Sequence, residues 1–118
     1  MAADAAPHLA VITATKAGNY TISGHGGTSA SAPLWAGLLA LADQDARRPL
    51  GFVNAGIYRI ADSADYHAAF HDVTTGHNTV AFPPTTINGY GTSRGWDAVT
   101  GWGSPDASLL VPLLTQRP

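Results

Sequence analysis

The sequence predicts a mixed α/β fold within a single unit of 118 residues. Three observations lead to this expectation. Two β-rich runs surround a turn in residues 8–23, residues 29–41 are apolar nearly all round, and residues 104–114 open with helix-start signals. Apolar residues make up 45% of the chain and charged residues only 12%, which is typical of a well-buried globular sequence.

The first expected element is a β-hairpin over residues 8–23, because Gly and Asn in the central KAGN are turn residues between two β-rich runs. A helix then runs from Ser29 to about Leu41. Its residues are apolar on every side and many are small, so we expect a helix that is buried all round. The polar stretch 43–49 (DQDARRP) follows, and its final proline marks the break.

The second half of the chain is expected to alternate short elements with a long loop. Apolar residues at helical spacing predict a short helix over 51–62, and residues 68–76 look like a strand end that runs into a loop. The segment 74–95 is rich in Thr, Gly, Asn and Pro, which favours a long loop.

The last expected element is a helix over residues 106–114. Its start signals are Ser104 at the N-cap position, Pro105 at the N1 position and Asp106 in the first turn. Pro112 is expected to end or bend it.

Composition excludes several classes of function. The net charge of −2 and the single lysine leave no basic stripe for nucleic acid. The absence of cysteine excludes disulfides and thiolate metal sites. The longest apolar run, near residues 32–42, is too short to cross a bilayer, and the N-terminus lacks the features of a signal peptide. All eight acidic residues are aspartates, so the chain has no glutamate.

The stretch 24–31, GHGGTSAS, allows two interpretations. Ser and Thr are common N-caps, so the stretch could be ordinary helix-start chemistry. A serine at this point also lies beside unpaired N–H groups and the positive end of a helix dipole, where an oxyanion is stabilised, and Gly26 and Gly27 let a substrate approach closely. A Walker A loop is excluded by the missing lysine, and the G-x-S-x-G elbow by Ser31.

Several blocks of the chain resemble the sedolisin or kumamolisin family of serine-carboxyl peptidases, which have a subtilisin-like fold. The pattern G-T-S-x-S-x-P is filled by Gly27, Thr28, Ser29, Ser31 and Pro33. Further similar blocks are ADAAP (3–7), LGFVNAGIY (50–58), FHDVTTGHN (70–78) and GWDAVTGWGSPD (95–106), whereas 78–92 is the least typical part. The resemblance implies that residues 1–118 are the C-terminal third of such a catalytic domain, with a partly parallel sheet and Ser29 as nucleophile at the N-terminus of a buried helix.

The resemblance implies an endopeptidase that works in acid, where a glutamate base still accepts a proton and a histidine does not. The family's catalytic Glu and Asp and its oxyanion Asp lie upstream, and none of them corresponds to Asp4, Asp43 or Asp45. We therefore expect the chain alone to be inactive, and to need the remainder of the domain and a peptide substrate as partners. The parent family is secreted. The alternative is a truncated, non-catalytic calcium-binding or structural module. A third possibility is a plain structural fragment whose fold depends on absent strands and is completed by swapping between copies.

Two aspartates in loops raise the question of a metal. Lone loop aspartates are mostly turn formers, but calcium accepts carboxylates together with backbone carbonyls. The resemblance implies a calcium site made by Asp72, Asp97 and the carbonyls of Val73, Ser93 and Gly95, although Ser93 stands where a glycine is expected. An EF-hand is excluded because its twelve-residue pattern ending in Glu is absent.

Histidines and tryptophans are weaker candidates. His67 and His71 are four residues apart, but they have no third ligand, which disfavours zinc. A Ser-His-Asp triad using His25 or His71 is disfavoured because His25 is only four residues from the serine. We expect Trp96 and Trp102, which stand beside glycines, to be packing residues.

Overall fold

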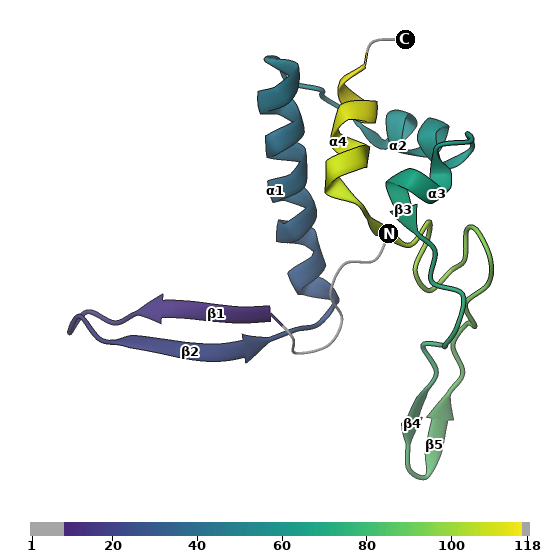
Figure 1. The fold of residues 1–118 in the computed structure, drawn as a ribbon. Coiled ribbons are helices and arrows are strands. Elements are labelled where there is room, and N and C mark those ends of the chain that lie inside the picture. Colours follow the sequence, from purple (N-terminus) through teal and green to yellow (C-terminus); the bar gives the residue numbers. More distant parts are fainter. Residues whose placement is uncertain (1–8, 117–118) are drawn as a thin grey trace.

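The computed structural model describes residues 9–116 as a body of helices from which two β-hairpins project (Figure 1). This is the mixed α/β class that the sequence predicts. The elements are, in chain order, β1 (Leu9–Ala14), β2 (Tyr20–His25), α1 (Thr28–Ala46), α2 (Asn54–Ala61), α3 (Tyr66–Ala69), β3 (Phe70–His71), β4 (Val80–Phe82), β5 (Thr85–Ile87), β6 (Ser104–Pro105) and α4 (Ala107–Thr115).

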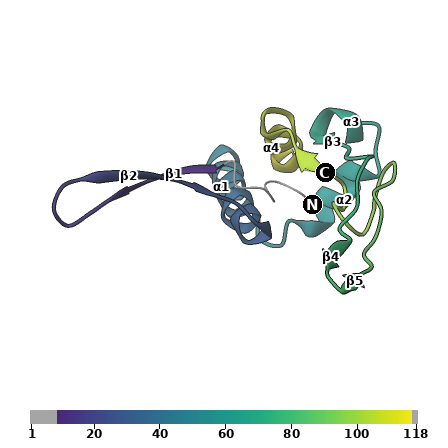
Figure 2. The same ribbon diagram turned by 90° about the horizontal axis from the view of Figure 1, so that it is seen from below.

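The predicted N-terminal hairpin is confirmed. Strands β1 and β2 pair antiparallel, with Ile12 opposite Ile22. Side chains alternate along a strand, so one face of the hairpin is an apolar ladder that includes this pair and Tyr20. These side chains are largely exposed, Ile22 by 74%. The hairpin extends away from the helices in both views (Figures 1 and 2).

Helix α1 begins where the sequence predicts but extends to Ala46. The expectation that it is buried on every side is wrong for this chain. Its buried residues are Leu38 and Ala42, whereas Leu41 is 59% exposed. The reason is geometric, since α1 packs mainly against α4 and the described residues place no layer over its other faces. An apolar helix surface is therefore left open to solvent.

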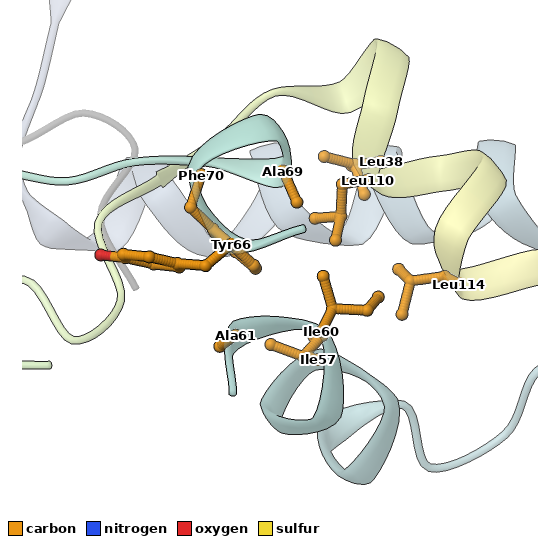
Figure 3. Packing of buried hydrophobic residues seen from close by; sticks show 9 residues of the cluster. All are labelled: Leu38, Ile57, Ile60, Ala61, Tyr66, Ala69, Phe70, Leu110 and Leu114. Carbon is orange, nitrogen blue, oxygen red and sulfur yellow. The ribbon is translucent and has the colours of Figure 1, made fainter. Parts of the chain in front are cut away.

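The hydrophobic core lies among α1, α2, α3 and α4 (Figure 3). Its largest fully buried side chains are Phe70, Ile57 and Leu110. The predicted helix over 51–62 is confirmed as α2, and Ile57 and Ile60 face the core as their spacing implies. The buried cluster consists of Leu38, Ile57, Ile60, Ala61, Tyr66, Ala69, Phe70, Leu110 and Leu114.

The chain exposes more surface than a compact protein of its length. Its accessible surface is 8129 Å², whereas a folded monomer of this mass exposes roughly 6,100 Å². Its radius of gyration is 17.2 Å, against about 13.5 Å for a compact domain of this length. The excess of about 2,000 Å² is comparable to the total surface buried in a stable protein interface.

The sequence suggested one long loop over residues 74–95, and this expectation is wrong. Strands β4 and β5 form a second hairpin, in which Val80 pairs with Ile87 and Phe82 with Thr85. Only three residues in each strand carry the β-pattern, and Pro83 and Pro84 form the turn. Runs this short fall below the length at which alternation is recognisable.

The last helix begins later than predicted. Its N-cap is Asp106, whose carboxylate accepts the N–H of Ser108, whereas Ser104 and Pro105 form β6 and pair with β3. Pro112 lies inside α4, which continues to Thr115. The helix is therefore capped by the Asp106 side chain and not by Ser104 followed by Pro105, as the sequence predicted.

The strand pairs of residues 9–116 are all antiparallel. The partly parallel sheet implied by the resemblance is not among them. Within the same residues, no helix has the combined length and apolar character needed to cross a lipid bilayer.

Candidate catalytic serine and candidate calcium loops

Ser29 lies in the first turn of α1, directly after the hairpin, and its side chain is exposed. Gly27 is the N-cap of α1 and has φ of 108°, a conformation that an L side chain rarely adopts. This glycine turns the chain from β2 into the helix. It also brings Ser29 to the helix end that carries the positive partial charge.

The amides of this first turn are not capped by a side chain. Gly27 has no side chain to accept them, and the first hydrogen bond of the turn runs from Ala30 N–H to the Gly27 carbonyl at 2.9 Å. The N–H groups before Ala30 are therefore available to a negatively charged oxygen beside Ser29.

Among residues 9–116, no hydrogen bond joins the Ser29 hydroxyl to a histidine or a carboxylate. His25 instead forms a hydrogen bond to the Ser23 hydroxyl, with 2.7 Å between Nε2 and Oγ. Asp4, which was not assigned a role, lies outside the described residues. The described part of the chain thus supplies no general base to Ser29.

The two candidate calcium loops are brought together at the base of the β4–β5 hairpin. Gly76 and Gly91 lie in its stem, where the Thr92 N–H donates to the Gly76 carbonyl at 3.0 Å. Beyond the stem, the Gly95 N–H donates to Asp72 Oδ2 at 2.9 Å. Asp72 and Gly95, which lie on either side of the hairpin in the sequence, are therefore neighbours in space.

Gly103 allows the close contact between the two loops. A Cβ at this position would lie 2.1 Å from the His71 carbonyl oxygen, and its φ is 89°. Only glycine fits both the space and the backbone conformation. The close approach positions Asp72, which follows His71, beside the segment that ends in Gly103.

Asp97 organises the second loop. Its side chain is 4% exposed and accepts the N–H groups of Ser93, Val99 and Thr100 and the Thr100 hydroxyl. Burial alone raises the pKa of Asp97, but the hydrogen bonds from Thr100, Ser93 and Val99 outweigh burial and hold that pKa below its ordinary value. Asp97 therefore stabilises the turn over residues 97–100, and its carboxylate is charged at neutral pH.

Asp72 differs from Asp97 in having an unused oxygen. Its Oδ1 is buried and has no hydrogen-bond partner, whereas Oδ2 accepts from Gly95. An unpaired buried carboxylate oxygen is costly, and a cation beside it would remove the cost. In this respect the loops fit a hard cation. Within residues 9–116 no three side chains of His, Cys, Asp or Glu converge, so a cation here would depend on backbone carbonyls.

Aromatic side chains pack behind these loops. Trp102 makes edge contacts with Tyr58 and Tyr66, at ring-centroid distances of 6.1 and 5.5 Å, so its expected packing role is confirmed. Trp96 is instead exposed, so the same expectation is wrong for that residue. His67 lies on α3 and His71 on the adjoining strand β3. Neither belongs to a metal-binding group among the described residues.

The chain is similar in sequence to known peptidases. It is 40% identical to kumamolisin from Bacillus sp. (strain MN-32) over 89 residues, which are 75% of this chain and 15% of that protein. It is 37% identical to human tripeptidyl-peptidase 1 over 93 residues, 75% of this chain and 16% of that protein. It is also 41% identical to tripeptidyl-peptidase 1 of Dictyostelium discoideum over 90 residues, 73% of this chain and 14% of that protein. The chain belongs to the sedolisin family.

This sedolisin-family chain spans about 15% of the length of the curated relatives it matches. No family model matches it, and no solved structure matches it. The family resemblance inferred from the G-T-S-x-S-x-P pattern is confirmed by the similarity to these peptidases over about 75% of the chain.

The sequence analysis did not identify two residues at the candidate calcium loops, Thr100 and Tyr66. Thr100 donates to Asp97 through both its N–H and its hydroxyl, and the spacing Asp-x-x-Thr is a signal for such a turn. Tyr66 reaches the loops from α3, and its hydroxyl donates to the Trp102 carbonyl at 3.3 Å. Burial, followed by interaction with Asp72 and by the charge of Asp97, raises the pKa of Tyr66 to about 12. No sequence motif marks this tyrosine.

Proposed function

We propose that the chain is the C-terminal third of a sedolisin-type catalytic domain, a serine-carboxyl endopeptidase, and that Ser29 is its nucleophile. The observation that carries the proposal is an exposed serine in an uncapped first helical turn, within the G-T-S-x-S-x-P pattern of a sedolisin-family chain. The peptidase names of the relatives support a peptide substrate. The setting would be secreted, as the family resemblance implies.

In this mechanism the Ser29 hydroxyl attacks the carbonyl of the scissile peptide bond. The open N–H groups of the first turn of α1 stabilise the oxyanion that forms, and Gly26 and Gly27 leave room for the substrate backbone. A glutamate carboxylate, which this chain does not contain, accepts the hydroxyl proton. A carboxylate base remains functional in acid because its ordinary pKa is about 4.3, below that of histidine.

The remainder of the catalytic domain is the proposed partner of α1 and of the β1–β2 hairpin. Leu41 on the helix and Ile12 and Ile22 on the hairpin are exposed. Burial of these faces would account for the large surface of the chain and for a helix without a polar side. The proposed partner also supplies the neighbours with which the subtilisin-like parallel sheet is completed.

The loops around Asp72 and Asp97 are the proposed calcium site. The carboxylates of both residues and the carbonyls of Val73, Ser93 and Gly95 would hold the ion. The support is the proximity of the two loops and the unpaired Asp72 Oδ1. Calcium bound there would neutralise two carboxylates and cross-link the stem of the β4–β5 hairpin to the core, so its contribution is stability rather than bond cleavage.

A second candidate function is a non-catalytic, calcium-stabilised module that supplies no activity of its own. The observation in its favour is that the described residues provide Ser29 with no base. The two functions differ in what they require of the serine. The proposed peptidase needs Ser29, whereas the module needs only the loops.

Two assays test the proposal. The 118-residue chain alone should cleave no peptide at pH of about 3–5, where a carboxylate titrates and can still accept a proton while a histidine is already protonated. Turnover that disappears in Ser29→Ala would show that a base is present after all. A chimaera that carries this chain in place of the matching part of kumamolisin should cleave peptides in acid. Ser29→Ala should abolish that cleavage, and Ser23→Ala is the matched control. A chimaera that stays active with Ser29→Ala contradicts the assignment.

A further inference from the structure

We propose that a cleft at the far end of the helical body binds a small amphipathic carboxylate. The cleft has a volume of about 300 Å³ and lies between the segment after α1, the start of α2 and the end of α4. A volume of this size is at the lower end of sites for small ligands. Figure 1 places the C-terminal ends of α1 and α4 at the end of the body opposite the β1–β2 hairpin, so the cleft is separate from Ser29.

The inner wall of the cleft is apolar. Leu50, Val53 and Leu114 line it, and all three also pack in or against the core. Gly56 lies at the same wall, where an added Cβ would approach Leu114 Cδ2 to 3.3 Å. The absence of a side chain at Gly56 therefore lets Leu114 pack closely against α2, and the apolar wall offers a surface for a short hydrocarbon chain.

The rim of the cleft is positively charged. Arg48 and Arg59 both line it and are exposed, and among the described residues neither guanidinium forms an ion pair. The nearest acidic residues along α1 have other partners: Asp43 accepts the Leu50 N–H at 2.8 Å, and Asp45 accepts the Thr115 hydroxyl at 3.0 Å. Two free guanidinium groups beside an apolar wall favour an anion with an apolar body.

The segment that carries Arg48 is held in place. The Arg48 N–H donates to the Asp43 carbonyl at 3.2 Å, and the Leu50 N–H donates to the carboxylate of the same residue. The backbone on both sides of Pro49 is therefore tied to the last turns of α1. Little ordering of the main chain is required on binding, which lowers the entropic cost of recognition.

The chemistry of the cleft defines the ligand as a carboxylate attached to a short apolar group. Two sources meet this description, a free medium-chain carboxylic acid and the chain end of a peptide whose last residues are apolar. Both place one carboxylate between the guanidinium groups and an apolar group against Leu50 and Leu114. The chain as a whole has a net charge of −2, so attraction of an anion is a local property of this cleft.

The experiment titrates the 118-residue chain with octanoate and with octanamide, and with acetyl-leucyl-leucine and its C-terminal amide, and follows amide resonances by NMR. Saturable shifts at Gly56 and Leu114 are expected for the carboxylates, with at least about tenfold weaker binding of the amides. Arg48→Gln and Arg59→Gln should each weaken binding about tenfold, because each removes a charge-assisted hydrogen bond. Lys16→Gln is the control that removes a distant positive charge.

The outcomes separate the sources and can overturn the proposal. Saturation by octanoate alone assigns the cleft to a free acid, and saturation by the peptide carboxylate alone assigns it to a chain end. Equal affinity for acid and amide, equal loss in Lys16→Gln, or no saturable shift with either carboxylate overturns it. Both arginine variants change exposed side chains, so circular dichroism should match that of the parent chain. Binding should be the same with Ser29→Ala, because the cleft does not depend on the proposed peptidase function.

Discussion

Replacement of Asp97 by alanine should cost more stability than replacement of Asp72, even without calcium. Asp97 is buried and accepts three backbone N–H groups and the Thr100 hydroxyl. Each buried donor left without a partner costs about 1–3 kcal/mol. Solvent reaches part of the loop around Val99 and Thr100, so we expect a total of about 3–4 kcal/mol for Asp97→Ala.

Asp72 is the matched control in this comparison. It accepts one backbone N–H, from Gly95, and its other oxygen is already unpaired. In excess chelator, Asp72→Ala should therefore cost about 1 kcal/mol, because the loss of one hydrogen bond is partly offset by removal of the unpaired oxygen. The measurement is urea unfolding at neutral pH, followed by circular dichroism.

Calcium and pH give two further readouts of the same pair of variants. Chelator should lower the melting temperature of the parent chain, and both variants should lose that sensitivity if the ion bridges the two loops. The lowered pKa of Asp97 means that its stabilisation is present above its unfolded pKa of about 3.9 and is lost as pH falls further, through the folded value. Asp97→Ala should flatten this acid dependence. Equal costs of the two variants in chelator, or a cost below about 1 kcal/mol for Asp97→Ala, would refute the reasoning.

Three other predictions concern the core and its edges. Gly103→Ala should destabilise the chain by at least about 2 kcal/mol in urea unfolding, because its Cβ would collide with the His71 carbonyl and its φ is positive; unchanged stability would contradict the close approach. The Tyr66 phenol should ionise near pH 12 in an absorbance titration, and the stability it contributes should be complete below pH of about 10 and lost as pH rises to 12; ionisation near pH 10 with the fold intact would count against its burial beside Asp72. Leu38→Ser should cost several kcal/mol, whereas Leu41→Ser should cost about 0.5 kcal/mol or less in the chain alone, because only Leu38 is buried; similar midpoints in urea for these two variants would mean that α1 is packed differently.

Local patterns in the sequence predicted the elements that short-range chemistry determines. The KAGN turn located the first hairpin, and the spacing of Val53, Ile57 and Ile60 located α2. The motif around Ser29 indicated the start of α1 and the family. In each case the signal lies within a few residues of the feature that it predicts.

Features that depend on distant contacts were not predictable in this way. The exposed side of α1 follows from which other segments pack on it, and an apolar sequence alone does not contain that information. The link from Tyr66 to the Asp72 loop joins residues brought together by the fold and not by spacing. The β6 strand replaced the predicted helix start at Ser104, because pairing with β3 competes with the local capping preference.

The β1–β2 hairpin leaves the outer edge of each strand without a partner among residues 9–116. Each free edge is a template on which another strand can be added, and the apolar ladder makes such addition favourable. In concentrated solution the chain would therefore associate edge to edge, and an expressing cell would need a chaperone or the rest of the domain to shield it. The solubility of this polypeptide therefore depends on whether another segment or protein covers the edges of the hairpin.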